Sequence, residues 1–377
     1  MRSTCASSAT SKQASSSGWG DRTRPAARSL TRAERVLLAL VAALVAGAGV
    51  ARYASGVSHV LAFVLATVAL AGVAWVVSLA TEQIGEHLGP APTGVLQSTV
   101  GNLPEFFVVI FALKAHQLVV AQTAIVGSIL VNALLVLGLV IVAGARRGNG
   151  IMRFSPRLPN DTATLLFGST FIIVLIGIAV AAHDPASHHT KTISIIGAVA
   201  ILLVYGTWMR QYLRSDVGVS GGGTARISVG VAVGLLVAAG TASAFVSDWF
   251  IHALGPTIHT LHLSQAFAGL VIAAIAGNAV EHAAGIALAA RGRSELAISV
   301  VKNSVSQLAS FLYPVLVLVS LLTATTLTFA LAPVYIGALF GTAVIVWQIT
   351  GDGEATVFEG AALVAAYVIL AAVAAYE

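Results

Sequence analysis

Two copies of one short acidic motif carry the chemistry that this sequence suggests. The pattern Gly-Asn-x-x-Glu occurs at residues 101–105 and again at residues 277–281. In each copy the asparagine and the glutamate are three residues apart, so they share one face of a helix. Both copies lie in apolar stretches, where an ionisable side chain costs several kcal/mol unless it faces a partner or water. We therefore expect Glu105 and Glu281 to form a functional site; the alternative is a pair of packing residues neutralised by a lysine or arginine.

The polar residues around these glutamates predict a cage of oxygen ligands for a cation. Carboxylate, amide, hydroxyl and carbonyl oxygens are hard ligands that suit Ca²⁺ rather than thiophilic metals. Pro104 removes a helix bond and frees the carbonyl of Val100, although a simple kink is the alternative. Hydrogen bonds between helices are the alternative role for the polar residues on the following helices. The candidate ligands are Glu105, Glu281, Asn102, Asn278, Ser98, Val100, Ser128, Asn132, Ser304 and Gln307.

The same two carboxylates predict coupling to protons. Without a cation, two buried carboxylates repel each other, so we expect them to bind protons when the metal leaves. Proton and cation would then compete for one site, which is the requirement for antiport. A different class of function is an intramembrane enzyme that uses Glu281 and His282, but it would need an asymmetric site.

The elements that position these residues are membrane helices. The chain has 377 residues, of which 57% are hydrophobic and only 9% charged, against about 25% charged in a soluble domain. Eleven apolar segments are long enough to span a bilayer. We therefore predict an all-α membrane protein with eleven transmembrane helices, centred near residues 44, 68, 103, 131, 172, 202, 237, 277, 308, 336 and 367.

Charge and cysteine content exclude other classes. The net charge is +5, but the basic residues lie in loops between apolar spans, so no nucleic-acid partner is expected. The single cysteine, Cys5, precedes the first span and permits neither a disulfide framework nor a thiolate metal site. No cofactor is expected beyond the transported ions.

The basic residues also predict the orientation. If the spans alternate, sixteen lysines and arginines fall on one side, only Arg52, Lys114 and Lys191 fall on the other, and Lys302 falls inside a span. The positive-inside rule then places the amino terminus in the cytosol and the carboxyl terminus outside.

The two motifs indicate an internal duplication. An offset of 176 residues superimposes Gly101 on Gly277 and, without a gap, Ser128 on Ser304. The two motifs fall in spans of opposite direction, so the repeat is inverted, and inverted repeats place substrate sites near the membrane midplane. We predict a disordered basic cytosolic tail (1–32), a first transmembrane helix (33–56), a five-helix repeat (57–213), a Gly-rich cytosolic linker (214–225) and a second five-helix repeat (226–377). A signal peptide is the alternative for residues 30–55.

Lys302 and three acidic residues near the cytosolic ends need separate interpretations. We expect Lys302 to snorkel to the cytosolic end of its helix; the alternative is that it repels cations from the site. Glu82, Glu86 and Glu359 are expected to attract cations to a cytosolic entrance, with solvated helix ends as the alternative.

Three stretches resemble the cation/proton exchanger family, the calcium/proton antiporters of the calcium/cation antiporter superfamily. They are residues 80–83 leading through 101–105 to 126–132, residues 277–282 leading to Ser304 and Gln307, and Phe358-Glu359-Gly360. The resemblance covers the chain from about residue 57. It implies that Glu105 and Glu281 are the transport carboxylates, that the polar residues named above line the site, and that His282 lies beside it and takes part in proton coupling.

The sequence departs from the pattern of this family at several places. Leu103 and Pro104 stand where the family has a small residue and threonine, Val131 replaces a small residue, and Lys302-Asn303 replaces Leu-Gly. The linker also carries no acidic run.

Together these observations predict a secondary antiporter that exchanges a divalent cation, Ca²⁺ first, for protons across the cytoplasmic membrane by alternating access. It would not be an enzyme, its partners would be Ca²⁺, protons and the lipid bilayer, and a homo-oligomer is possible. A Na⁺/Ca²⁺-type exchanger of the same superfamily and a non-transporting relative are the alternatives.

Overall fold

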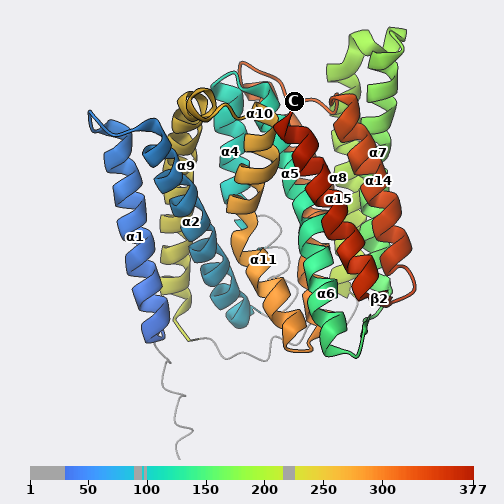
Figure 1. Cartoon of the computed structure of the whole chain (residues 1–377), viewed down its shortest axis with the longest axis horizontal. Helices are drawn as coiled ribbons and strands as arrows, with labels where there is room; N and C mark the ends of the chain where they lie inside the picture. The colour runs from blue at the N-terminus through green and yellow to red at the C-terminus, as the bar shows by residue number, and fades with distance from the viewer. Residues whose placement is uncertain (1–29, 89–95, 97–99, 215–225) are drawn as a thin grey trace, which may run out of the picture.

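The computed structural model describes residues 30–88, 96, 100–214 and 226–377, and within them the chain is helical apart from one short two-stranded sheet (Figure 1). The predictions for the tail, up to residue 29, and for nearly all of the linker lie outside these residues.

The first half of the chain forms a row of long helices with one π-helical segment. Its elements are α1 (Arg32–Tyr53), α2 (His59–Leu88), α4 (Leu103–Lys114), α5 (Leu118–Leu130), the π-helix η1 (Val131–Val136), α6 (Leu137–Arg147), β1 (Ile151–Arg153), α7 (Arg157–Ala181), the 3₁₀-helix η2 (Pro185–His189) and α8 (Thr190–Arg214).

The second half has a similar series of elements. They are α9 (Val229–Leu261), α10 (Gln265–Phe267), the π-helix η3 (Ala268–Ala273), α11 (Ala274–Ala290), α12 (Ser294–Gln307), the π-helix η4 (Leu308–Leu312), α13 (Tyr313–Val319), the 3₁₀-helix η5 (Ser320–Leu322), α14 (Pro333–Thr350), β2 (Glu354–Thr356) and α15 (Val357–Ala375).

The described residues contain nine helices that are long and apolar enough to cross a membrane, or ten if the bent pair in residues 265–290 forms one span. The chain is therefore a multi-pass membrane protein. The predicted span centred near residue 103 does not appear as one continuous helix in these residues, because α4 begins at Leu103 and has only 12 residues. At 1.5 Å per residue it is about 18 Å long, less than the roughly 30 Å hydrocarbon core.

Helices α2 and α9, with which the two predicted repeats begin, pack along each other at one edge of the bundle, and α1 packs on both (Figure 1). An ion pair ties the start of α1 to the segment before α9, with 2.6 Å between Glu34 Oε1 and a guanidinium nitrogen of Arg226. On the opposite side, the α7–α8 hairpin extends past the neighbouring helices. The central helices carry both acidic motifs or lie next to them.

Two features bring α15 and β2 onto the first half of the chain. An added Cβ at Gly138 on α6 would lie 2.6 Å from the carbonyl oxygen of Gly360 on α15, so the two helices cross at a distance that only glycine permits. Strands β1 and β2 pair antiparallel, with Ile151 opposite Thr356, and Arg153 Nε donates to Glu354 Oε1 over 2.9 Å. The Glu-Gly pair at 359–360 therefore has a clear role in folding.

Candidate functional site

The helix is interrupted at the first acidic motif and bends at the second. In the first, Val100 is helical, Gly101 and Asn102 form a turn, and α4 starts at Leu103. In the second, the segments Gln265–Ala279 and Glu281–Ala290 meet at 67°. The predicted break at the first motif is present, but Pro104 lies in the first turn of α4, where a missing N–H costs little, rather than inside a helix.

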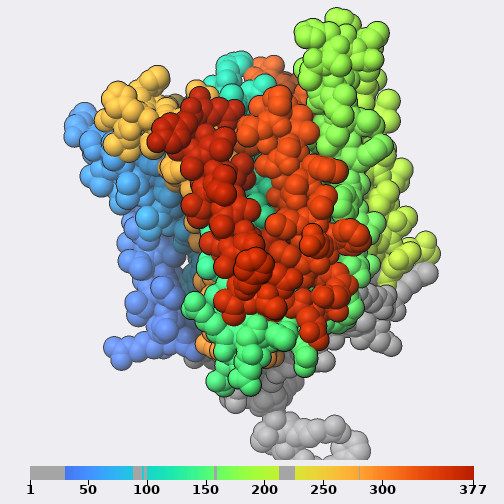
Figure 2. Space-filling model, turned by 45° about the vertical axis from the view of Figure 1, so that its right-hand side comes forward, coloured from blue at the N-terminus to red at the C-terminus, as the bar shows by residue number. Residues whose placement is uncertain are grey.

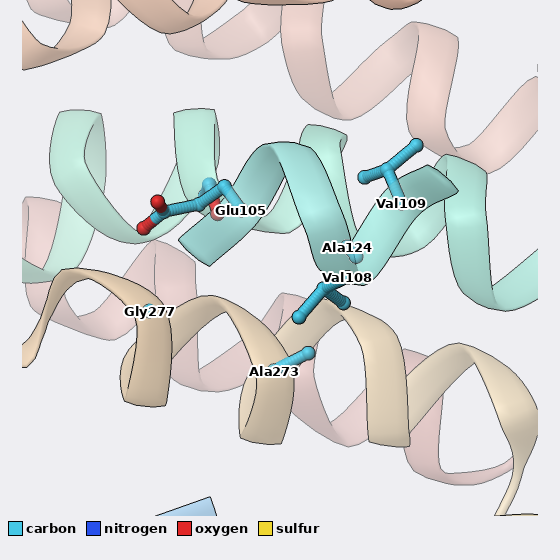
Figure 3. A pocket seen from close by; sticks show the side chains of 7 residues that line it. Glu105, Val108, Val109, Ala124, Ala273 and Gly277 are labelled. Carbon is cyan, nitrogen blue, oxygen red and sulfur yellow. The ribbon is translucent and has the colours of Figure 1, made fainter. Parts of the chain in front are cut away.

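The carboxylate of Glu105 reaches across to the second motif. Glu105 is buried, with 6% of its surface exposed, and an added Cβ at Gly277 would lie 2.5 Å from its Oε1 atom. Figure 3 shows the Glu105 side chain on α4 facing the segment that carries Gly277. Glu281 follows Gly277 by one turn on α11. The fold thus brings the two predicted carboxylates to one place.

Each glutamate keeps one oxygen without a protein partner. The Oε2 atoms of Glu105 and Glu281 are closed off from solvent and accept no hydrogen bond from the described residues. A buried ionised oxygen left in this way is costly, so each carboxylate requires a proton or a cation. Over the same residues, no group of three or more His, Cys, Asp or Glu side chains comes together. A cation here would therefore also need amide and hydroxyl oxygens.

The two motif asparagines provide such oxygens from opposite halves of the chain. Asn278 Nδ2 donates to Ser128 Oγ over 3.2 Å, and Asn102 Nδ2 donates to Gln307 Oε1 over 3.4 Å. Each asparagine thus contacts the polar residue of the other half. These bonds use the amide nitrogens, which leaves both Oδ1 atoms free of these contacts and able to accept a ligand.

Several further polar atoms in this region are buried and unpaired among the described residues. They include Asn132 Oδ1, Ser304 Oγ and His282 Nε2. Asn132 Nδ2 donates to the carbonyl of Ser128 over 2.9 Å, and Ser304 is a polar neighbour of the Glu281 carboxylate. Unpaired oxygen atoms on η1 and α12, both in contact with α11, fit a cation or ordered water. Ser98 lies outside the described residues.

A small enclosed cavity adjoins Glu105. Its volume of about 10 Å³ is enough for roughly one water molecule. The cavity lies between α4, α5, η3 and α11 (Figure 3), and its walls are Glu105, Val108, Val109, Ala124, Ser128, Ala273 and Gly277.

A pair of π-helical segments flanks the site and was not predicted. The offset of 176 residues places η1, Val131–Val136, on residues 307–312, and the second half has its π-helix η4 at Leu308–Leu312. Each segment follows the helix that carries Ser128 or Ser304. Single-turn π segments often mark functional sites because they rotate the side chains that follow. No sequence signal identifies them, since one inserted residue does not disturb an apolar pattern.

Lys302 does not snorkel to solvent. Its side chain is fully buried, and Nζ donates to Thr350 Oγ1 over 3.0 Å. Thr350 is in the last turn of α14, the end of a helix dipole that favours positive charge. The expectation failed because α7 packs on α12 and Thr350 at the end of α14 accepts from the amine, so the side chain ends inside the bundle. Lys302 makes no ion pair with Glu105 or Glu281 in the described residues, so neither carboxylate is neutralised by it.

The three predicted entrance acids lie on α2 and α15, whereas Glu105 and Glu281 lie on α4 and α11. Glu359 forms a capping box at the start of α15, where its Oε2 accepts from the backbone N–H of Thr356 over 2.8 Å. Glu82 is exposed and interacts electrostatically with Arg226, and Glu86 is partly buried in the next turn of α2. Glu359 therefore stabilises the amino-terminal end of α15.

Comparison with known proteins gives consistent matches over most of the chain. The family model described as "Sodium/calcium exchanger protein" matches residues 58–210 and 231–376. The Ca²⁺/H⁺ antiporter ChaA of Bacillus subtilis is 29% identical over 301 residues, 78% of this chain and 85% of its own length. The vacuolar calcium ion transporter of Schizosaccharomyces pombe is 30% identical over 320 residues, 82% of this chain and 77% of its own.

The fold also matches a solved structure. The native structure of YfkE, a Ca²⁺/H⁺ antiporter protein, superimposes with a TM-score of 0.75 and 26% identity, over 91% of this chain and 99% of the other.

Proposed function

Because the chain belongs to the sodium/calcium exchanger protein family, we propose that it moves Ca²⁺ across a membrane in exchange for protons. The relatives described above are named as Ca²⁺/H⁺ antiporters or as a calcium ion transporter, which favours protons over Na⁺ as the counter-ion. They are transporters and not enzymes, so the intramembrane-enzyme alternative is set aside.

One observation carries this proposal: Glu105 of the first half reaches Gly277, one turn from Glu281 of the second half, and each glutamate has a buried oxygen that no described residue satisfies. Such a pair is stable only with a positive partner, and both Ca²⁺ and protons can serve. We propose that Glu105 and Glu281 bind the transported Ca²⁺ together with oxygens from the other predicted ligands: Ser98, Val100, Asn102, Ser128, Asn132, Asn278, Ser304 and Gln307. No cofactor is needed.

Competition at the carboxylates would couple the two fluxes. A Ca²⁺ ion neutralises both carboxylates, and its departure leaves two negative charges that repel each other in a low dielectric. A proton on Oε2 of each glutamate removes this cost, so the site can change access loaded with either species but not empty. His282, whose Nε2 is buried without a partner in the described residues, is proposed to assist proton transfer at Glu281.

We further propose the finer architecture of one extra helix followed by two inverted five-helix repeats, with eleven spans in total. Support comes from the two segments that match one family model and from the π-helices at equivalent positions in both halves. The count of basic residues favours a cytosolic amino terminus and an external carboxyl terminus. The end of the bundle with β1 and β2 would then face the cytosol, with Glu82, Glu86 and Glu359 near the entrance.

The proposal is tested by uptake of radioactive Ca²⁺ into inside-out membrane vesicles. An imposed proton gradient, acid inside, should drive uptake, and collapse of the gradient with a protonophore should stop it. A sodium gradient of the same size should drive no uptake. Uptake driven by sodium alone would favour the Na⁺/Ca²⁺-type alternative, and no uptake under either gradient would favour a non-transporting relative.

A further inference from the structure

Arg52 is a basic residue on the side of the membrane where this chain has few. It lies in the last turn of α1, at the end of the bundle opposite β1 and β2. In the positive-inside count it is one of three basic residues on that side. A positive charge on the side of the membrane that usually carries few of them requires a specific local interaction.

The described residues provide no anion for Arg52. Its Nε atom is closed off from solvent without an acceptor, and the guanidinium takes part in no ion pair there. The nearest acidic candidate on the neighbouring helix α9 is Asp248, which lies 3.9 Å from His252 Nδ1 in the next turn. At the other end of α1, by contrast, Glu34 is paired with Arg226.

Trp249 on α9 packs against this end of α1. The indole Nε1 of Trp249 on α9 is also buried without an acceptor in the described residues. α1 and α9 are in close contact here, since an added Cβ at Gly49, one turn before Arg52, would lie 2.9 Å from the Trp249 ring. The ring of Tyr53 packs edge-on against Trp249, with centroids 6.5 Å apart. The Trp249 ring therefore packs against the last turn of α1, the turn that carries Arg52.

The surface next to these donors is apolar and exposed. Phe245, one turn nearer the middle of α9, contacts the Trp249 ring at 6.2 Å between centroids and is 56% exposed. Val50 and Tyr53 on α1 are 65% and 74% exposed. Figure 2 shows α1 as a separate column at the edge of the molecule. Aromatic and basic residues in this arrangement are typical of the level where lipid headgroups meet acyl chains.

We propose that the guanidinium of Arg52 binds the phosphate of an anionic phospholipid through its Nη groups, which are not among the closed-off atoms, with an acyl chain against Phe245, Val50 and the Trp249 ring. The exposed apolar side chains favour a lipid over free phosphate, because they would bury against the chain. The uncompensated charge of Arg52 favours a net-anionic headgroup. A choline headgroup is disfavoured because the guanidinium, 5.3 Å from its centroid, already occupies a face of the Tyr53 ring. With the orientation proposed above, this lipid belongs to the outer leaflet.

The test uses the full-length protein in phosphatidylcholine vesicles that contain increasing fractions of phosphatidylglycerol with brominated acyl chains. Bromine quenches nearby tryptophan fluorescence, and the difference between the wild type and Trp249→Phe isolates the signal of Trp249. We expect this signal to saturate at a low fraction of the anionic lipid. In Arg52→Gln, half-saturation should require a fraction of the anionic lipid about tenfold higher, because one charge-assisted hydrogen bond is lost. Arg52→Lys should reach half-saturation at a lipid fraction between those of the wild type and Arg52→Gln.

Lys114→Gln is the matched control, since Lys114 is also a basic residue on this side and lies 5.5 Å from the centroid of Phe111. It should leave the quenching curve unchanged, and thermal melting in detergent should show that all variants are folded. Equal quenching by brominated phosphatidylcholine, or an unchanged curve for Arg52→Gln, would overturn the proposal. Loss of quenching on addition of inorganic phosphate would show that the site binds free phosphate instead. None of these outcomes depends on whether the protein exchanges Ca²⁺ for protons.

Discussion

Gly277→Ala tests whether the Glu105 carboxylate must approach the second motif closely. The new Cβ would lie 2.5 Å from Glu105 Oε1 and 3.0 Å from its Cδ atom, where ordinary contacts start near 3.4 Å. The carboxylate must therefore withdraw by about 0.9 Å. Ligands of Ca²⁺ lie at about 2.3–2.6 Å, so a shift of this size removes Glu105 from the coordination shell or forces the cation to follow it.

The expected loss can be estimated from the interaction that is removed. A ligand held by a charged group contributes about 1.5–3 kcal/mol, which corresponds to a decrease in Ca²⁺ affinity of roughly 10- to 100-fold. The assay is isothermal titration of Ca²⁺ into the purified protein at a fixed pH, followed by proton-driven uptake in vesicles. Thermal melting should show a folded protein, because the added methyl group displaces the end of one side chain and no backbone atom.

Gly285→Ala on the same helix is the matched control. Its Cβ would meet only methyl groups, Val301 Cγ2 at 3.2 Å and Val140 Cγ2 at 3.4 Å, so a loss below about threefold is expected, well within the tenfold that 1.4 kcal/mol represents. Glu105→Asp shortens the carboxylate arm and should partly rescue Gly277→Ala, giving a double variant that is better than the additive expectation. The reasoning is refuted if Gly277→Ala binds Ca²⁺ as tightly as Gly285→Ala.

Four further outcomes follow from the same geometry. Glu105→Gln and Glu281→Gln should each abolish exchange in uptake assays while the protein stays folded, since they remove a buried charge; transport by either variant would contradict the two-carboxylate site. Calcium affinity should rise with pH between about 6 and 8, by up to about 100-fold per unit if two protons must leave first, and a flat titration would exclude direct competition. Lys302→Met should change affinity less than about threefold because the amine bonds to Thr350 rather than to the site, whereas a hundredfold gain would show that it competes with the cation. Thr350→Val should lower the free energy of unfolding by about 1–3 kcal/mol by removing that acceptor, and Lys302→Met should restore it in a thermal-melt cycle.

The sequence was most informative about residues whose spacing along the chain reflects a function. The Gly-Asn-x-x-Glu repeat identified both glutamates, and the structure brings Glu105 against Gly277 of the other copy. A carboxylate in an apolar segment is a strong signal because its burial cost must be balanced by something. The family expectation rested on the same residues and was confirmed by the match to one family model over both halves.

Features that depend on how helices pack were beyond the reach of the sequence. The span near residue 103 was predicted from hydropathy, which averages over a window and does not register the turn at Gly101 and Asn102. The burial of Lys302 depends on Thr350, which is 48 residues away in the chain. Snorkelling was a reasonable expectation from the length of the lysine stem, but it assumed that the amine has no acceptor inside the bundle, and Thr350 provides one.

Lys302 also shows where the two halves are not equivalent. The offset of 176 residues maps Lys302 onto Val126 and Thr350 onto Val174, so the polar contact of the second half corresponds to two apolar residues in the first. In an inverted repeat, alternating access requires each half to adopt the arrangement of the other in turn. A buried amine with one acceptor in the described residues is costly to separate from it, whereas the valines lose only apolar contacts. Under the inverted-repeat architecture proposed above, separating Lys302 from Thr350 should therefore cost more than the corresponding opening in the first half, so the two access states would differ in population even without an ion gradient.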